Sequence, residues 1–228
     1  MLWRHGRTSW NAQRRFQGHS DVELDEVGLA QAQATASQLA LLKPDKIVSS
    51  DLLRANVTAN ALATLVDLPV TTDVDLRETR AGRWEGLTRP ELERKYGDEL
   101  AAWAAGSNLA PGGGERRSEV ATRMMRAINR ALDDVPAQGC LVIVTHGGSA
   151  RAAIGSMLSL PVAHWGIFGV LTNCAWCVLT EANGRTDSLV DISSGPTATF
   201  PDVPPTPPWR LVEYNASSLP TEGLADDR

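Results

Sequence analysis

The stretch Leu141–Gly148, which reads LVIVTHGG, decides the fold. Its first five residues, Leu141–Thr145, form a continuous apolar and β-branched run that is typical of a strand buried on both faces of a parallel sheet. His146 and Gly147 follow at once, and the next residues predict the start of a helix. A buried strand that leads into a helix is the repeating unit of α/β proteins.

The sequence on either side repeats this unit. We expect, in order, a short strand end at 1–3, a helix over 25–42 with Asp25 as N-cap, a strand over 47–50, a helix over 51–66 and an extended segment over 70–76. Between 115 and 135 apolar residues recur at steps of three or four, which predicts one more helix. Alternating strands and helices predict an α/β fold: a three-layer sandwich with a mostly parallel central sheet flanked by helices.

The remaining segments carry weaker patterns. A loop over 77–88 is expected to precede short helical pieces near 90–92 and 100–103. We expect edge strands over 174–180, 188–192 and 210–214, separated by a Pro-rich loop over 196–208 that cannot join a ladder. Residues 1–217 are therefore interpreted as a single domain and 218–228 as a disordered tail.

The composition limits which partners the protein can bind and in which compartment we expect it. A net charge of −5 provides no general attraction for nucleic acid or an anionic membrane. No window is long and apolar enough for a membrane span, and no secretory signal opens the chain, so we expect a cytoplasmic protein. Cys174 and Cys177 form a C-x-x-C pair, but in a strand they would lie on opposite faces, which favours buried thiols over a metal or redox site.

Polar side chains gather where the expected parallel strands end. His5 and His146 each end a strand. Arg54 lies one turn into the helix after the second strand, and Glu78 follows the third. Because ligands of α/β sheets bind beyond the carboxyl ends of the strands, we expect these side chains to converge on one pocket.

The charge of this pocket favours an anion. With Arg4 it would hold two arginines and two histidines. A phosphoryl group carries about −1.5 to −2 charges and offers three acceptor oxygens, two of which a planar guanidinium can bind together. The same cations disfavour a metal ion, and the glycine run 112–114 lacks the Lys-Ser/Thr ending of a phosphate-binding P-loop. We expect no metal and no cofactor.

These residues suggest a covalent mechanism. A neutral His5, with one ring nitrogen held by an acceptor such as a backbone carbonyl, is suited to attack phosphorus. Arg4, Arg54 and a protonated His146 would stabilise the charge on the phosphoryl oxygens. Glu78 would protonate the leaving alkoxide and later activate water.

The role of Glu78 has two alternatives. The side chain could form a structural ion pair with one of the nearby arginines 77, 80 and 83. Glu85 is the nearest rival for the general acid.

Four segments, in order along nearly the whole chain, resemble the histidine phosphatase superfamily, also called the phosphoglycerate mutase-like family. Residues 4–11 (RHGRTSWN) resemble its R-H-G-x-T-x-x-N signature, and 49–55 (SSDLLRA) its second-arginine segment. Residues 76–78 with 82–86 resemble its acid-bearing loop, and 145–148 its second histidine.

This resemblance implies a metal-independent phosphatase that forms a phosphohistidine at His5. It further implies the roles of the other residues: Glu78 as proton donor, and Arg4, Asn11, Gln17, Arg54, His146 and Gly147 around the phosphoryl group. The substrate would be a phosphorylated small molecule. A phosphoglycerate mutase, or a binding module without turnover, remains an alternative.

The Trp84–Thr88 stretch (WEGLT) resembles the phosphatase branch of this family. The C-terminal third resembles an actinobacterial subfamily that acts on glucosyl-3-phosphoglycerate, which also implies a homodimer. Arg116 departs from the Ser that often follows Gly-Gly-Glu in related sequences. It would favour a carboxylate-bearing substrate or be a solvated helix residue, and the sequence does not separate the two.

Overall fold

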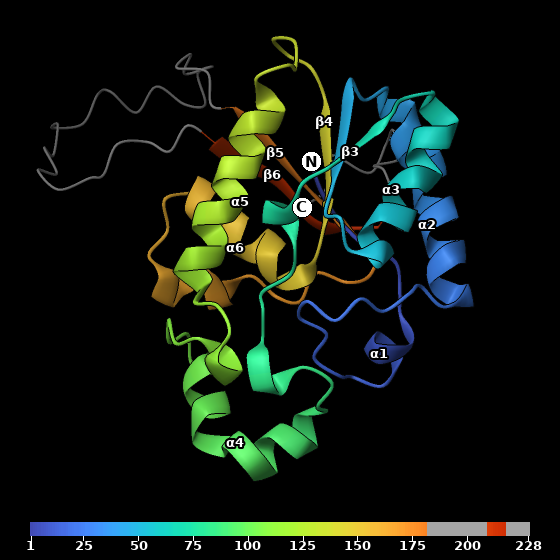
Figure 1. Ribbon diagram of the computed structural model, residues 1–228. Helices are drawn as coiled ribbons and strands as arrows, with labels where there is room; N and C mark the ends of the chain where they lie inside the picture. Colours follow the sequence, from blue (N-terminus) through green and yellow to red (C-terminus); the bar gives the residue numbers. More distant parts are fainter. Residues whose placement is uncertain (182–208, 218–228) are drawn as a thin grey trace, which may run out of the picture.

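The computed structural model describes residues 1–181 and 209–217, which form one mixed sheet between two layers of helices (Figure 1). The strands are β1 (Leu2–Arg4), β2 (Lys46–Ser49), β3 (Val70–Thr72), β4 (Leu141–Thr145), β5 (Trp176–Glu181) and β6 (Trp209–Ala216), in the sheet order β3-β2-β4-β1-β5-β6. The first four are parallel, β5 runs antiparallel to β1, and β6 runs antiparallel to β5. The expected mostly parallel sheet is confirmed.

Helices cover both faces of this sheet. Figure 1 shows α2 (Glu26–Leu39) and α3 (Leu53–Val66) on one face and α5 (Arg117–Leu132) and α6 (Gly147–Met157) on the other. Val142 and Val144 pack into the core below α2 and α3, whereas Ile143 between them packs below α5 and α6. The alternation has the period of two expected of a strand, and it confirms the three-layer sandwich.

A small cap lies beyond the carboxyl ends of the parallel strands. It consists of α1 (Ser9–Ala12), α4 (Arg89–Ala104) and the loops around them (Figure 1). Trp84 is fully buried in a separate cluster under α4, edge-on to Phe16 and Trp103. The two expected helical pieces are one helix with a kink at Tyr96, begun by a capping box between Thr88 and Glu91.

Short 3₁₀ turns connect these elements: η1 (Ala40–Leu42), η2 (Val74–Leu76), η3 (Gly82–Trp84), η4 (Pro111–Gly113) and η5 (Val162–Ile167). The expectation of an extended segment over 70–76 is wrong beyond Thr72, because the Asp73 carboxylate accepts from Asp75 N at 2.9 Å and caps η2. The helix after β2 begins at Leu53 and not at Asp51, whose carboxylate binds Arg77 at 2.5 Å.

The cysteine prediction agrees with the structure. Cys174 and Cys177 are buried, lie in different core clusters and carry free thiols. Burial raises the pKa of Cys174 to about 12 and that of Cys177 to about 11, so neither thiol is activated.

The C-terminal strands differ in detail from the prediction. β5 begins only at Trp176, since Cys174 has φ +60, and it is not an edge strand because it lies between β1 and β6. The expected strand over 188–192, the Pro-rich loop and the tail lie outside the described residues. Among the residues described, no helix is long and apolar enough to cross a membrane.

Candidate active site

His5 directly follows β1 and continues its ladder, with its backbone N–H donating to Thr145 O at 3.1 Å. The side chain is 2% exposed, and its Nδ1 lies 2.7 Å from Gly6 O. Because a carbonyl only accepts, Nδ1 must carry the ring hydrogen, which leaves the lone pair on Nε2. Burial, and then the charges of Arg54 and Arg4, hold the pKa of His5 well below its usual value. The predicted neutral imidazole with one fixed nitrogen is therefore present.

Arg54 lies in the first turn of α3 and is fully buried. Its two terminal nitrogens donate to backbone carbonyls of the loop before α2, Nη1 to Ser20 O at 2.8 Å and Nη2 to Gly18 O at 2.9 Å. Burial lowers its pKa to about 10, so the side chain stays charged at neutral pH.

Glu85 holds the same loop. Its carboxylate accepts from His19 N at 3.2 Å, from Ser20 Oγ at 3.1 Å and from Ala81 N at 3.0 Å. Glu85 is thus engaged in organising the backbone around Arg54.

His146 follows β4 as the N-cap of α6, and its ring centroid lies 5.1 Å from that of His5. Its Nε2 lies 2.9 Å from Ser50 Oγ. That hydroxyl oxygen accepts from Leu52 N at 3.3 Å, so its own hydrogen is available for Nε2. When Ser50 donates to Nε2, the ring hydrogen of a neutral His146 lies on Nδ1.

Without a bound anion, the site favours neutral His146, whereas the expected protonated form concerns the site with a phosphoryl group bound. The ring is fully buried, and this burial, together with the charges of Arg54, His5 and Arg4, lowers its pKa well below the usual value. A bound dianion would oppose the two arginines and raise this pKa again.

Three donors of the site share one property. Arg4 Nε, Arg54 Nε and His146 Nδ1 are buried and have no hydrogen-bond partner within the described part of the chain. A buried donor without a partner costs about 1–3 kcal/mol, so such groups favour a ligand that accepts from them. Their convergence suits an anion with several acceptor oxygens.

Arg4 contributes one of these donors from the end of β1. Its Nη1 donates to Leu171 O, which fixes the guanidinium from the side of the loop before β5. Burial lowers the pKa of Arg4, partly offset by the negative charge of Glu78.

Glu78 lies at the N-terminus of α6. Its carboxylate accepts three backbone N–H groups, from Gly148 and Ser149 at 2.9 Å and from Thr79 at 2.8 Å. The alternative that Glu78 forms a structural ion pair with a nearby arginine is wrong. Arg77 pairs with Asp51, and no ion pair between described residues includes Glu78. Glu78 therefore lies beside His146, as the strand-end rule predicts.

The other three expected residues surround the loop after β1. Asn11 forms a capping box with Thr8, and Gln17 Oε1 accepts from Thr8 Oγ1 at 3.0 Å. Gly147 packs against Arg4, where a Cβ would lie in ordinary van der Waals contact, 3.4 Å from Arg4 Nε. Asn11 and Gln17 thus support the His5 loop through bonds within the protein.

Sequence reasoning missed three residues that hold the site together. Ser50 orients His146, and Asn173 Nδ2 donates to His5 O at 3.1 Å and Gly6 O at 3.2 Å. Arg123 on α5 donates to the backbone carbonyl of Glu78 at 2.8 Å. A polar residue at a strand end was the available signal for Ser50 and Asn173; nothing in the pattern of α5 marks Arg123.

No group of three or more His, Cys, Asp and Glu side chains among residues 1–181 and 209–217 is arranged to hold a metal ion.

Comparison with known proteins agrees with this geometry. A family model described as "Histidine phosphatase superfamily (branch 1)" matches residues 1–191. A glucosyl-3-phosphoglycerate phosphatase of Mycolicibacterium vanbaalenii is 36% identical over 227 residues, which cover 96% of this chain and 94% of the relative. A metal-independent phosphoserine phosphatase of Arabidopsis thaliana is 38% identical over 156 residues, covering 67% of this chain and 65% of the relative.

A solved structure shows the same architecture. The mycobacterial glucosyl-3-phosphoglycerate phosphatase in complex with VO₃ superposes with a TM-score of 0.80 at 35% identity, covering 94% of this chain and 97% of that chain.

Proposed function

The chain belongs to the histidine phosphatase superfamily, and on this premise we propose that it hydrolyses phosphomonoesters through a phosphohistidine at His5. One observation carries the proposal. A buried neutral His5, with Nδ1 fixed by Gly6 O, lies 5.1 Å from His146 in a site where three buried donors lack partners. A nucleophilic Nε2 beside an array of N–H groups is what phosphoryl transfer through histidine requires.

In the first step, the Nε2 lone pair of His5 attacks phosphorus and the bond from phosphorus to the ester oxygen breaks. Arg4, Arg54 and His146 donate to the non-bridging oxygens, whose charge grows most in the transition state. Glu78, protonated at the start of this step, gives its proton to the leaving oxygen, so the product leaves as an alcohol.

In the second step, water attacks the phosphohistidine. Glu78, now a carboxylate, takes a proton from this water as the P–N bond breaks, which releases phosphate and restores neutral His5. The three backbone N–H groups that hold Glu78 keep it in one position for both proton transfers.

We propose glucosyl-3-phosphoglycerate, or a related phosphorylated small molecule, as the substrate. The relative of Mycolicibacterium vanbaalenii that carries this activity in its name aligns with 96% of the chain, and the agreement extends through the cap as well as the sheet. The proposal needs no metal and no cofactor, because both the nucleophile and the anion donors come from the chain.

A rapid-quench experiment tests the covalent step. The protein is mixed with a ³²P-labelled phosphomonoester and quenched in alkali, where phosphohistidine survives. We expect labelled protein that loses its label in acid, and no label in His5→Ala, whose circular dichroism spectrum should match that of the native chain. Label retained in His5→Ala would refute the assignment of His5.

A substrate panel tests Glu78 and the alternatives. Glu78→Gln should slow an alkyl phosphate more than p-nitrophenyl phosphate, which leaves without protonation; equal slowing of both would reject Glu78 as the acid. Interconversion of 2- and 3-phosphoglycerate faster than phosphate release would favour a mutase. Absence of phosphoenzyme with every substrate would favour a binding module.

We also propose that the protein acts as a cytoplasmic homodimer, as its resemblance to the family implies. The three free cysteines of the described chain fit a reducing compartment. Size-exclusion chromatography with light scattering should give twice the mass of one chain, and a monomer at micromolar concentration would contradict the dimer.

A further inference from the structure

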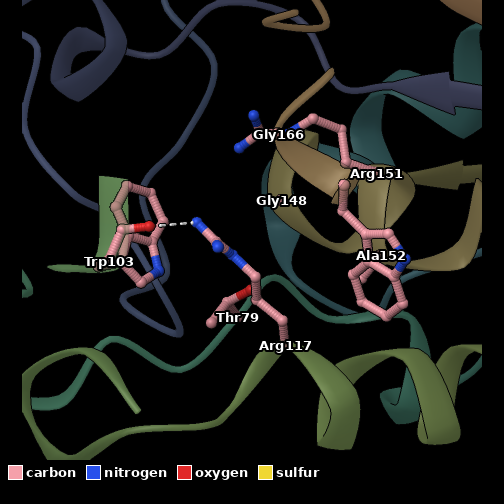
Figure 2. A pocket seen from close by; sticks show the side chains of 8 residues that line it. Thr79, Trp103, Arg117, Gly148, Arg151, Ala152 and Gly166 are labelled. Carbon is pink, nitrogen blue, oxygen red and sulfur yellow. Dashed lines mark hydrogen bonds between the residues drawn. The ribbon is translucent and has the colours of Figure 1, made fainter. Parts of the chain in front are cut away.

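A small pocket adjoins the candidate active site, between α4, α5 and α6 (Figure 2). Its lining includes Thr79, Trp103, Arg117, Gly148, Arg151 and Trp165. Two of these connect it to the proposed general acid: Thr79 follows Glu78 in the chain, and Gly148 donates its N–H to the Glu78 carboxylate at 2.9 Å. The pocket therefore lies on the side of Glu78, where the leaving group of a substrate would extend.

Arg151 reaches this pocket from α6. It follows Gly148 by three residues, so both lie on the same side of the helix. Its side chain is partly buried, yet it forms no hydrogen bond or ion pair with any described residue. Among the described residues that line the pocket, none is acidic. The N–H groups of Arg151 are therefore available to an anion that enters the pocket.

Arg117 approaches the same space from the start of α5, and Figure 2 shows it opposite Arg151. It is held in place: Nη2 donates to Trp103 O at 2.8 Å, Nη1 to Ser107 O at 3.3 Å, and the guanidinium carbon lies 4.8 Å from the centre of the Trp103 ring. Burial, and next the positive charge of Arg151, lowers the pKa of Arg117. The two cations thus repel each other across the pocket.

We propose that Arg151, assisted by the charge of Arg117, binds a carboxylate on the leaving group of the substrate. The proposal rests on the proposed function and deepens it, because it limits the preferred substrates to phosphorylated hydroxy acids, in which one molecule carries both anions. An anion between the two guanidinium groups would remove their repulsion and supply the partner that Arg151 lacks.

The structure favours a carboxylate over a second phosphoryl group. Arg151 forms no hydrogen bond with a described residue, and one planar guanidinium matches one carboxylate through two parallel hydrogen bonds. Arg117 has given one N–H of each terminal nitrogen to a carbonyl group, so it adds mainly its charge. Arg116, for which the sequence left open either this role or that of a solvated helix residue, is exposed at the N-cap of α5 and does not line the pocket. Arg116 is thus a solvated residue at the start of the helix, and it is the adjacent Arg117 that lines the pocket.

A pair of substrates with the same three-carbon skeleton tests the proposal. 3-Phosphoglycerate carries the carboxylate, and glycerol 3-phosphate lacks it. We expect the native protein to show a higher kcat/KM for 3-phosphoglycerate, and Arg151→Gln to reduce this preference about 10- to 100-fold, mainly through KM, as expected when a hydrogen-bonded charge loses its partner. Inhibition by D-glycerate should weaken by a similar factor.

Arg116→Gln is the matched control, since it removes the same charge outside the pocket; its substrate preference should equal that of the native protein. An unchanged preference in Arg151→Gln, or an equal loss for both substrates, would overturn the proposal. So would a loss confined to substrates with a second phosphate, tested with fructose 1,6-bisphosphate against fructose 6-phosphate. Formation of the labelled phosphoenzyme from p-nitrophenyl phosphate in the native protein separates these outcomes from failure of the proposed function itself.

Discussion

His5, the proposed nucleophile, depends on one carbonyl group. Gly6 O accepts from His5 Nδ1 at 2.7 Å and from Asn173 Nδ2 at 3.2 Å. Asn173 also donates to His5 O and to Asn11 Oδ1, so a single amide connects the loop after β1 to the segment before β5. Because Asn173 holds the carbonyl that selects the tautomer of His5, we infer that it is a positioning residue.

Asn173→Ala should lower kcat about 2- to 10-fold while KM changes little, because each lost hydrogen bond is worth roughly 1 kcal/mol and acts on the orientation of the nucleophile. The measurement is kcat with p-nitrophenyl phosphate from pH 5 to 8. We also expect the acidic limb of the profile to move, since a less restrained imidazole protonates more readily. Thr172→Ala, which removes a neighbouring exposed hydroxyl, is the control. A profile identical in shape and height to that of the native protein would reject the role.

At the scale of elements, α5 positions the loop that carries the proposed acid. Arg123 is 8% exposed, and its guanidinium donates to the carbonyl oxygens of Asp75, Arg77 and Glu78 at 2.6–2.8 Å. It also pairs with Glu115 at 3.0 Å. Three hydrogen bonds from one side chain thus bind carbonyl groups of a loop that has no strand ladder, because β3 ends at Thr72.

Arg123→Met should lower the free energy of unfolding by about 3–5 kcal/mol, since it leaves the Glu115 charge and three carbonyls without their partner. Urea unfolding measures this loss, and kcat for an alkyl phosphate should fall in the protein that remains folded. Arg130→Met on the same helix is the matched control. Arg130 pairs with Asp73 and Asp75 but its side chain is 52% exposed, so its loss should cost at most about 1 kcal/mol. Equal losses in the two variants would contradict the special role of Arg123.

At the scale of the whole molecule, the convergence of the site followed from topology. His5, Arg54, Glu78 and His146 come from four separate segments, and the shared direction of parallel strands brings them to one edge whatever the loops do. The sequence therefore predicted the sandwich and the convergence of these four side chains.

The residues that adjust the site were not predictable in this way. The position of Asn173 depends on the left-handed conformation of the next residue, Cys174, which precedes β5. Arg117 faces the pocket because it is the first residue of α5, whereas Arg116 is the N-cap. Such details depend on single backbone angles and on helix phase, which hydrophobic periodicity does not resolve. The lowered pKa of His146 in the site without an anion was not predictable for a related reason, since burial, the largest cause of its shift, is a property of the assembled fold.

Burial of the site has a consequence for stability. His5 and His146 have pKa values well below that of an unfolded histidine, about 6.5, and the pKa of His19 is lowered as well. Below about pH 6.5 the unfolded chain therefore binds more protons than the folded chain, so the free energy of unfolding falls as the pH falls. Each fully shifted histidine contributes a slope of about 1.4 kcal/mol per pH unit until the folded form also protonates.

We expect the free energy of unfolding, measured with urea in phosphate-free buffer, to fall by about 3 kcal/mol per pH unit between pH 6 and 5, and His146→Gln to lose about half of this slope. The exposed histidine serves as control: His164→Gln should keep the native slope. Added phosphate should flatten the dependence in the native protein, because an anion between Arg4 and Arg54 raises the pKa of the folded His146 towards its unfolded value. If neither His146→Gln nor phosphate changes the slope of the free energy of unfolding against pH, His146 binds protons equally in the folded and the unfolded chain. The proposal of a buried anion site beside His146 would then be wrong.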